Sequence, residues 1–332
     1  MKNNKGIMGA LLTLITIVLL LPVQALAAGG IDLNRGARLT ISYQDGSTSI
    51  VEAGFSIYQV ATVNETGKLT TAPDFSQFNV NIGGQNDTAW NTLATTLEGY
   101  VLRDAVPPTD TGKTSNLGML SFPNGAKKLT AGLYLVIGFR HTQNEYIYDA
   151  QPFMVMLPSL DKESNDWLYE VTVNPKYDKR HKPSGSDDTI TRKVLKVWKD
   201  EGHTKDRPKE VVVQLLRNGK VYDTVTLNAG NQWRYTWTDL DDAYVWRVVE
   251  KQLEGYTVAV TREGVTFVVT NTYIEEPPEP DFPPPNPPPP PDPPGKPSLP
   301  QTGQLWWPVP ALLAAGMLLL IVGLVRRRDD CR

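Results

Sequence analysis

Lys196, Glu250 and Asn271 carry side chains that could react with one another if the fold buried them together. Side chains alternate faces along a strand, and each of the three shares a face with large apolar residues, as Lys196 does with Val194 and Trp198. Burial lowers the pKa of an amine and raises the pKa of a carboxyl, so an uncharged, nucleophilic amine and a protonated acid could coexist at neutral pH. The alternative is a buried lysine–glutamate ion pair, with Asn271 as an ordinary capping or turn residue.

The segment 190–274 must position these residues, and its pattern is typical of an all-β domain. Short apolar runs recur at the spacing of a β-sandwich, and Asn218-Gly219 between two of them is a type I′ hairpin signal. The predicted strands are residues 193–198, 210–217, 221–227, 232–237, 244–250 and 265–272.

Motifs in this segment resemble the CnaB-type domain of surface adhesins and pilins. They are LKVW at 195–198, WRYTW at 233–237, Glu250 with Gly255-Tyr256, and TNTY at 270–273. The resemblance implies an intramolecular isopeptide bond between Lys196 and Asn271, assisted by Glu250, with loss of ammonia. Such a bond forms once in each molecule, so it does not make the chain an enzyme.

The preceding segment, residues 28–177, also alternates apolar and polar residues, with strands predicted at 38–43, 54–61, 132–138, 151–157 and 167–173. Residues at helical spacing between them predict one amphipathic helix that crosses or caps the sheet: Trp90, Leu93, Ala94, Leu97 and Val101. With a polar linker at 178–189, we expect a mainly β chain of two tandem Ig-like, CnaB-like sandwiches, the first with a helical insertion. Tyr43 stands where such domains often carry lysine, so we expect no crosslink in the first sandwich.

The first segment ends in WLYEVTVNPK at 167–176, which resembles the motif WxxxVxVYPK of sortase-assembled Gram-positive pilins, with Asn174 in place of tyrosine. In that family the motif lysine accepts the threonine acyl group of another subunit, and the resemblance implies this role for Lys176. Pro175 ends the strand and can present Lys176 beside a domain junction. The alternative is an exposed linker lysine without a special role.

The C-terminal segment 299–332 has three parts in a fixed order. The apolar run 305–325 has the roughly 20 residues that a helix needs to cross a bilayer, and the arginines at 326–328 would hold the tail in the cytoplasm. Directly before the run stands a pentapeptide: Leu299, Pro300, Gln301, Thr302 and Gly303. The whole resembles the LPxTG sorting signal, which implies that a sortase cysteine attacks the Thr302 carbonyl and joins the chain to peptidoglycan.

Residues 1–27 predict a signal peptide, because two lysines precede an apolar run that ends in the small-residue site Ala25-Leu26-Ala27. The alternative is an uncleaved N-terminal membrane anchor. Residues 275–298 are dominated by proline and predict an extended polyproline II spacer through the wall. Cys331 lies in the tail that a sortase would remove, so no disulfide is expected.

A net charge of −3 gives no reason to expect nucleic acid as a partner. His141, His181 and His203 fall in predicted loops or linkers, without the context of a metal site or a catalytic triad, so no metal, cofactor or enzymatic activity is expected.

The sequence therefore predicts a secreted protein, inserted in the membrane as a precursor and then fixed covalently to the cell wall. The leading hypothesis is a minor or basal pilin that sortases incorporate through Thr302 and Lys176. The alternatives are a shaft pilin and a monomeric anchored adhesin. Expected partners are sortase, peptidoglycan, other pilin subunits and, for an adhesin, a host or matrix ligand.

Overall fold

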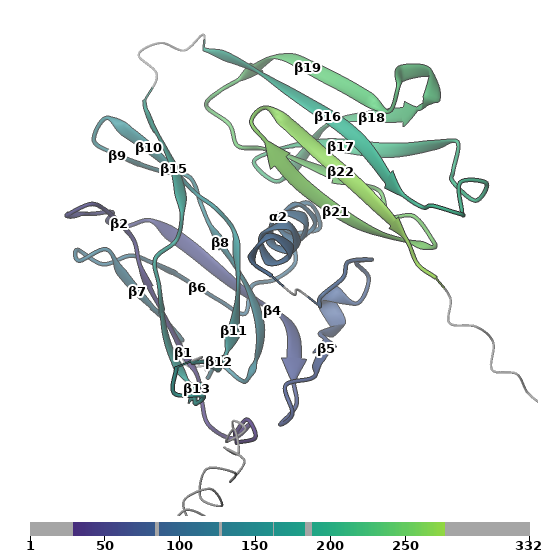
Figure 1. Cartoon of the computed structure of the whole chain (residues 1–332). Helices are drawn as coiled ribbons and strands as arrows, with labels where there is room; N and C mark the ends of the chain where they lie inside the picture. The colour runs from purple at the N-terminus through teal and green to yellow at the C-terminus, as the bar shows by residue number, and fades with distance from the viewer. Residues whose placement is uncertain (1–28, 84–85, 126–127, 162, 183–187, 276–332) are drawn as a thin grey trace, which may run out of the picture. The chain divides into compact units, whose positions relative to one another are not determined.

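The computed structural model describes residues 29–83, 86–125, 128–161, 163–182 and 188–275. They form two β blocks, residues 29–182 and 188–275, and the single α-helix of these residues, α2, lies between the blocks (Figure 1). The predicted signal peptide, nearly all of the spacer and the sorting signal with its apolar run at 305–325 lie outside the described residues. Within the described ranges, no helix combines the length and apolar character that crossing a bilayer requires.

The first block has two main sheets that pack face to face. One has the strand order β14-β1-β7, and the other the order β11-β8-β4-β5, with β6 also paired to β4. A smaller sheet has the order β15-β10-β9, and β2-β3 and β12-β13 are short hairpin pairs. The strands are Arg38–Ser42 (β1), Gln44–Asp45 (β2), Thr48–Ser49 (β3), Gly54–Val63 (β4), Leu69–Thr71 (β5), Asp110–Lys113 (β6), Met119–Phe122 (β7), Gly132–Gly138 (β8), His141–Gln143 (β9), Tyr146–Ala150 (β10), Phe153–Leu157 (β11), Ser159–Leu160 (β12), Trp167–Leu168 (β13), Glu170–Val173 (β14) and Tyr177–His181 (β15).

The second block is a sandwich of two sheets with the strand orders β19-β16-β22-β21 and β18-β17-β20. Its strands are Thr189–Lys199 (β16), Glu210–Arg217 (β17), Lys220–Asn228 (β18), Arg234–Asp241 (β19), Trp246–Glu250 (β20), Tyr256–Glu263 (β21) and Thr266–Tyr273 (β22). Asn218 and Gly219 both have positive φ, as the predicted hairpin turn between β17 and β18 requires. The prediction of a mainly β chain with a helix in its first part is confirmed.

Helix α2 spans Asp87–Arg103, and the Asn86 side chain caps its first turn by accepting a hydrogen bond from the Ala89 amide at 2.9 Å. Residues 96–101 are all buried, so apolar surroundings cover the helix on more than one side. A helix at a protein surface buries one stripe and exposes the opposite face. The sequence predicted an amphipathic helix that crosses or caps the first sheet, and the structure shows that helix enclosed between two blocks.

Two strands differ from the expected arrangement. Residues 177–181 fall almost wholly in the predicted linker 178–189, but they form β15 and pair antiparallel with β10. Their charged sequence Tyr-Asp-Lys-Arg-His resembles a linker, and only the partner strand makes it part of a sheet. Strand β21 was not among the predicted strands, although its buried residues Tyr256, Val258 and Val260 alternate with a period of two.

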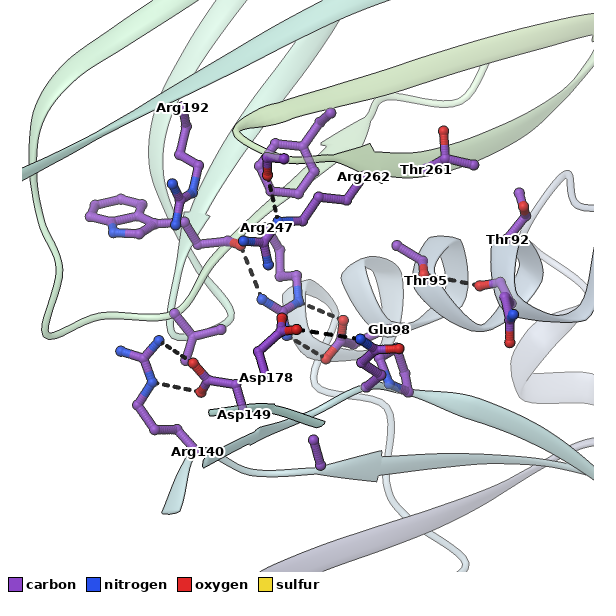
Figure 2. A pocket seen from close by; sticks show the side chains of 18 of the residues that line it. Thr92, Thr95, Glu98, Arg140, Asp149, Asp178, Arg192, Arg247, Thr261 and Arg262 are labelled. Atoms are coloured by element: carbon purple, nitrogen blue, oxygen red, sulfur yellow. Dashed lines mark hydrogen bonds and ion pairs between the residues drawn. The ribbon is translucent and has the colours of Figure 1, made fainter. Parts of the chain in front are cut away.

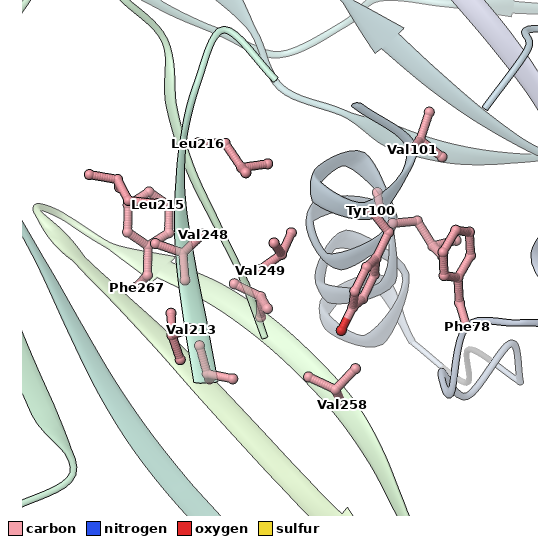
Figure 3. Packing of buried hydrophobic residues seen from close by; sticks show 14 of the residues in the cluster. Phe78, Tyr100, Val101, Val213, Leu215, Leu216, Val248, Val249, Val258 and Phe267 are labelled. Carbon is pink, nitrogen blue, oxygen red and sulfur yellow. The ribbon is translucent and has the colours of Figure 1, made fainter. Parts of the chain in front are cut away.

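One apolar cluster extends across both blocks. It joins residues of the first block, such as Phe78 and Leu135, to residues of the second, such as Val213 and Phe267, with α2 between them. Figure 3 shows Tyr100 of α2 and Val249 of β20 within this packing. The blocks therefore share a hydrophobic core, whereas a second cluster around Leu39 and Phe55 lies wholly within the first block.

Candidate functional site

Three strands of the second block place Lys196, Glu250 and Asn271 in its interior. Strands β16 and β22 run parallel and adjacent, with Lys196 opposite Val269 and Trp198 opposite Asn271, so the lysine and the asparagine lie diagonally on one sheet face. Glu250 is the last residue of β20 in the facing sheet. The three residues are 4%, 1% and 1% exposed, so the structure brings together the side chains that the alternation pattern placed inward.

The carboxyl group of Glu250 lies between the other two side chains. Asn271 Nδ2 donates a hydrogen bond to Glu250 Oε1 at 2.6 Å, and Lys196 Nζ is 3.6 Å from Glu250 Oε2. Lys196 Nζ also donates to the main-chain carbonyls of Val197 and Val269, at 3.0 and 3.3 Å. Glu250 Oε2 and Asn271 Oδ1 are buried without a hydrogen bond from any described residue. The site is therefore closed to bulk solvent, and two of its oxygen atoms lack a hydrogen bond from the described residues.

Desolvation has the largest influence on the pKa values of Lys196 and Glu250. It lowers the pKa of Lys196 below its ordinary value, although the nearby Glu250 carboxylate acts in the opposite direction. It likewise raises the pKa of Glu250, although Lys196 and Asn271 favour the ionised form. Proton transfer from the ammonium to the carboxylate leaves two neutral groups, which cost less free energy to bury than two ions.

An aromatic wall closes the site on the lysine side. The Trp198 ring centroid is 4.2 Å from Lys196 Nζ, and the Arg207 guanidinium carbon is 5.1 Å from the same ring. Asp200 holds Arg207 through two hydrogen bonds of 2.6 and 2.8 Å. Tyr256 and Trp233 pack edge-on against Trp198, so the wall keeps water away from the amine.

The structure refines the role expected of Glu250. Its carboxyl contacts the amide nitrogen of Asn271, which is the group that would leave as ammonia, and not the carbonyl oxygen. A half-turn of the amide about its terminal torsion, which has two nearly equivalent positions, would bring Oδ1 to the same carboxyl. One carboxyl can thus serve both steps, polarising the carbonyl and protonating the leaving nitrogen.

Lys176 lies at the other candidate position, between β14 and β15 of the first block. Its side chain is exposed, Pro175 before it is buried, and its main-chain carbonyl accepts a hydrogen bond from the Gln151 amide at 2.8 Å. The backbone is therefore held while the amine projects into solvent. Thr302 and the rest of the predicted sorting pentapeptide lie outside the described residues.

A cavity of about 680 Å³ lies beside α2, with lining residues from both blocks (Figure 2). Ion pairs cross or border it: Arg247 with Glu98, Arg140 with Asp149, and Arg180 with Asp242. Sequence reasoning did not find these residues, because no local motif marks them and two of the three pairs join residues that are 62 and 149 positions apart. Among the described residues, no group of three or more His, Cys, Asp or Glu side chains is arranged to hold a metal ion.

Comparison with known proteins assigns each block to a domain type. The family model for the N-terminal domain, D1, of Gram-positive pilin subunits matches residues 28–178, and that for the Cna protein B-type domain matches residues 192–272. The two matches support a Gram-positive surface pilin or adhesin. They also support a location on the cell surface.

A collagen adhesin of Staphylococcus aureus is 32% identical to this chain over 144 residues. The match covers 33% of this chain and 12% of that adhesin, so it concerns a small part of the relative.

Solved structures of similar proteins include a single B repeat unit of the collagen-binding surface protein of Staphylococcus aureus, with 18% identity, coverage of 73% of this chain and 99% of that chain, and a TM-score of 0.25. The full-length major pilin SpaD of Corynebacterium diphtheriae has 18% identity, coverage of 73% and 65%, and a TM-score of 0.27.

Proposed function

We propose that this chain is a minor or basal pilin subunit, joined covalently to its neighbours through Thr302 and Lys176 and stabilised by a self-formed bond between Lys196 and Asn271. The observation that carries the proposal is the buried contact of Glu250 with both other side chains, at 2.6 and 3.6 Å. The match of the first block to a pilin D1 domain supports the subunit role.

The bond-forming step follows from the geometry of the site. The neutral Lys196 amine attacks Asn271 Cγ, a new carbon–nitrogen bond forms, and the bond from Cγ to Nδ2 breaks. Glu250 takes one proton from the attacking nitrogen and gives one to the leaving nitrogen, so that ammonia departs and the carboxyl returns to its starting state. The product is a neutral secondary amide, whose nitrogen can no longer be protonated inside the core.

Intact mass spectrometry of the purified chain tests the internal bond. We expect a mass lower than the sequence mass of the mature chain by one ammonia, and a peptide that joins Lys196 to Asn271 after digestion. Lys196→Ala is the matched control, because it removes the nucleophile and must show the full sequence mass. An unshifted mass in the unmodified chain would exclude the bond.

The covalent link to other subunits is tested separately, in the bacterium that makes the protein. Lys176→Ala should abolish the high-mass ladders that contain this chain, whereas Lys182→Ala, which removes another exposed lysine nearby, should leave them intact. Mass spectrometry of wall fragments should find one partner on Thr302 and another on Lys176. Ladders that persist in Lys176→Ala would exclude this lysine as the sole acceptor.

The second candidate function is a monomeric wall-anchored adhesin, favoured by the match to a collagen adhesin. It requires no ladder and no partner on Lys176, but it keeps the internal bond and the link through Thr302. The same wall digest therefore separates the two functions.

A further inference from the structure

Helix α2 of the first block closes an open side of the second sandwich. Strands β20 and β21 are edge strands of its two sheets, and each has main-chain groups without a neighbouring strand. Edge groups that are buried without a partner are costly, so a folded protein must supply one. The first block supplies it for both edges.

The edge of β21 donates two hydrogen bonds to acceptors of the first block. Its Val258 amide donates to the Asn79 carbonyl at 2.9 Å, and its Val260 amide donates to Thr96 Oγ1 of α2 at 2.8 Å. These contacts replace a neighbouring strand. Val258 lies opposite Asn271 and Val260 lies opposite Val269, so the contacts act on the main chain of β21 and not on the main chain of Glu250.

The edge of β20 is held at Glu250, the residue that would transfer protons in the proposed bond-forming reaction. Tyr100 of α2 donates its hydroxyl to the main-chain carbonyl of Glu250 at 2.8 Å, and both groups are buried. Within its sheet, Glu250 pairs only with Val213 of β17, so the Tyr100 hydroxyl acts from the other side of the strand. The backbone that carries the carboxyl is thereby fixed from two directions.

Two further contacts fix the same strand against the helix. Arg247 donates to both carboxylate oxygens of Glu98, at 2.5 and 3.0 Å. A Cβ atom at Gly99 would lie 2.5 Å from Val249 Cγ1, so only glycine lets β20 approach this closely. Residues 98, 99 and 100 of α2 thus contact residues 247, 249 and 250 of β20, in an arrangement that Figure 3 shows around Tyr100 and Val249.

We propose that Tyr100 is a positioning residue for Glu250, so that the crosslink in the second block forms efficiently only after α2 of the first block has docked. This inference rests on the Lys196–Asn271 bond proposed above. Glu250 must reach both the attacking and the leaving nitrogen, and a small displacement of a group that transfers protons is enough to slow a reaction strongly. Docking would also delay the irreversible step until both blocks are folded.

The test follows bond formation in newly made protein. The full chain is produced by cell-free translation, synthesis is stopped, and the loss of ammonia is timed by mass within the protease-resistant, folded fraction. Tyr100→Phe removes only the hydroxyl, and we expect it to slow bond formation about tenfold, the scale on which small misplacements of a reacting group act. Glu98→Gln, which weakens the hold on Arg247 of the same strand, should slow it in the same direction.

Thr96→Val is the matched control. It removes a hydroxyl from the same helix, but one that contacts β21. We expect it to lower thermal stability as much as Tyr100→Phe does and to leave the rate in the folded fraction unchanged. A merely structural role for Tyr100 predicts equal rates in the two variants, and that outcome would overturn the inference.

The outcomes also separate this inference from the proposed bond. If the unmodified chain never loses ammonia, the bond itself is absent and both proposals fall. If the unmodified chain and Tyr100→Phe react at the same rate, the bond stands and the positioning role is excluded.

Discussion

The two blocks share a strand arrangement, but the side chains that point inward from it differ in chemical type. In each, an early strand pairs in parallel with a late one: β1 with β14 in the first block and β16 with β22 in the second. Along β1 and the residue after it, Leu39, Ile41 and Tyr43 point inward and are fully buried. Along β16 the inward positions include Lys196, which faces Glu250 and Asn271.

Beside its own pair of parallel strands, the first block keeps its charges near the surface. Asp45 accepts hydrogen bonds from Tyr148, Tyr177 and Lys179, at 2.9, 3.1 and 2.5 Å, and Lys179 is a third exposed. Behind this cluster, Tyr43 packs edge-on against Phe55 and Tyr177. Aromatic pairs of this kind stabilise a core through the burial of their rings and their edge-to-face contacts.

The second block buries charges that stabilise little as an ion pair, because desolvation offsets most of their attraction. If Lys196 reacts with Asn271 to form an amide, the lysine can no longer carry a charge, and the cost of burying that charge is removed. The comparison therefore predicts that the stability of the second block depends strongly on Lys196, Glu250 and Asn271. In the first block, we expect no single group of polar side chains to contribute as much stability.

The largest expected effect comes from Asn271→Ala, which removes the acceptor of the bond. A covalent link between residues 196 and 271 closes a long loop, and by the loop-entropy argument its loss costs about 4 kcal/mol. For a domain of this size that corresponds to a fall of about 20 °C in melting temperature. Calorimetry measures it. Asn231→Ala, which removes a capping asparagine from a surface turn of the same block, should cost only about 1 kcal/mol. Equal losses in the two variants would contradict the comparison.

A somewhat smaller effect is expected for Glu98→Gln, because the two blocks are coupled through α2. The variant leaves the partly buried Arg247 without its ionic partner, and removing one member of a largely buried pair costs about 3 kcal/mol. Urea unfolding followed by block-specific probes should change from one transition to two. A single transition at the original midpoint would show that the pair does not couple the blocks.

A smaller effect again is expected from pH, and only without the bond. Because burial lowers the pKa of Lys196 in the folded state, the unfolded state binds more protons between the folded pKa and 10.5, so stability rises as pH rises through that window. In Asn271→Ala the urea midpoint should therefore increase from pH 7 to pH 10. In the linked chain the lysine is an amide and cannot titrate, so this increase should be absent. The same increase in both proteins would show that the lysine is free.

The smallest effect is expected for Tyr43→Phe in the first block. The Tyr43 hydroxyl is buried without a hydrogen bond from any described residue, so removing it deletes an unsatisfied group and leaves the ring packing intact. The melting temperature should stay the same or rise slightly, with a change in stability within about 0.5 kcal/mol. A large loss of stability would mean that the Tyr43 hydroxyl makes an interaction that stabilises the first block as strongly as Lys196, Glu250 and Asn271 stabilise the second.

Much of the second block could be predicted from its residues. Alternation placed Lys196, Glu250 and Asn271 on inward faces, and the Asn218-Gly219 signal gave the turn between β17 and β18. Strand β21 shows the same alternation and could have been found by the same rule. The charged segment of β15 could not, because its membership in a sheet depends on β10 and not on its own composition.

The sequence by itself determined which side chains of a strand or helix share a face, because the periods of 2.0 and 3.6 residues are properties of the backbone. It therefore placed Lys196, Glu250 and Asn271 inward and predicted the helix. Only the tertiary structure decided that α2 is buried on more than one side and that Tyr100 holds the main chain of Glu250. These two residues are 150 positions apart, and no local pattern encodes a contact that forms only when two separately patterned blocks pack against the same helix.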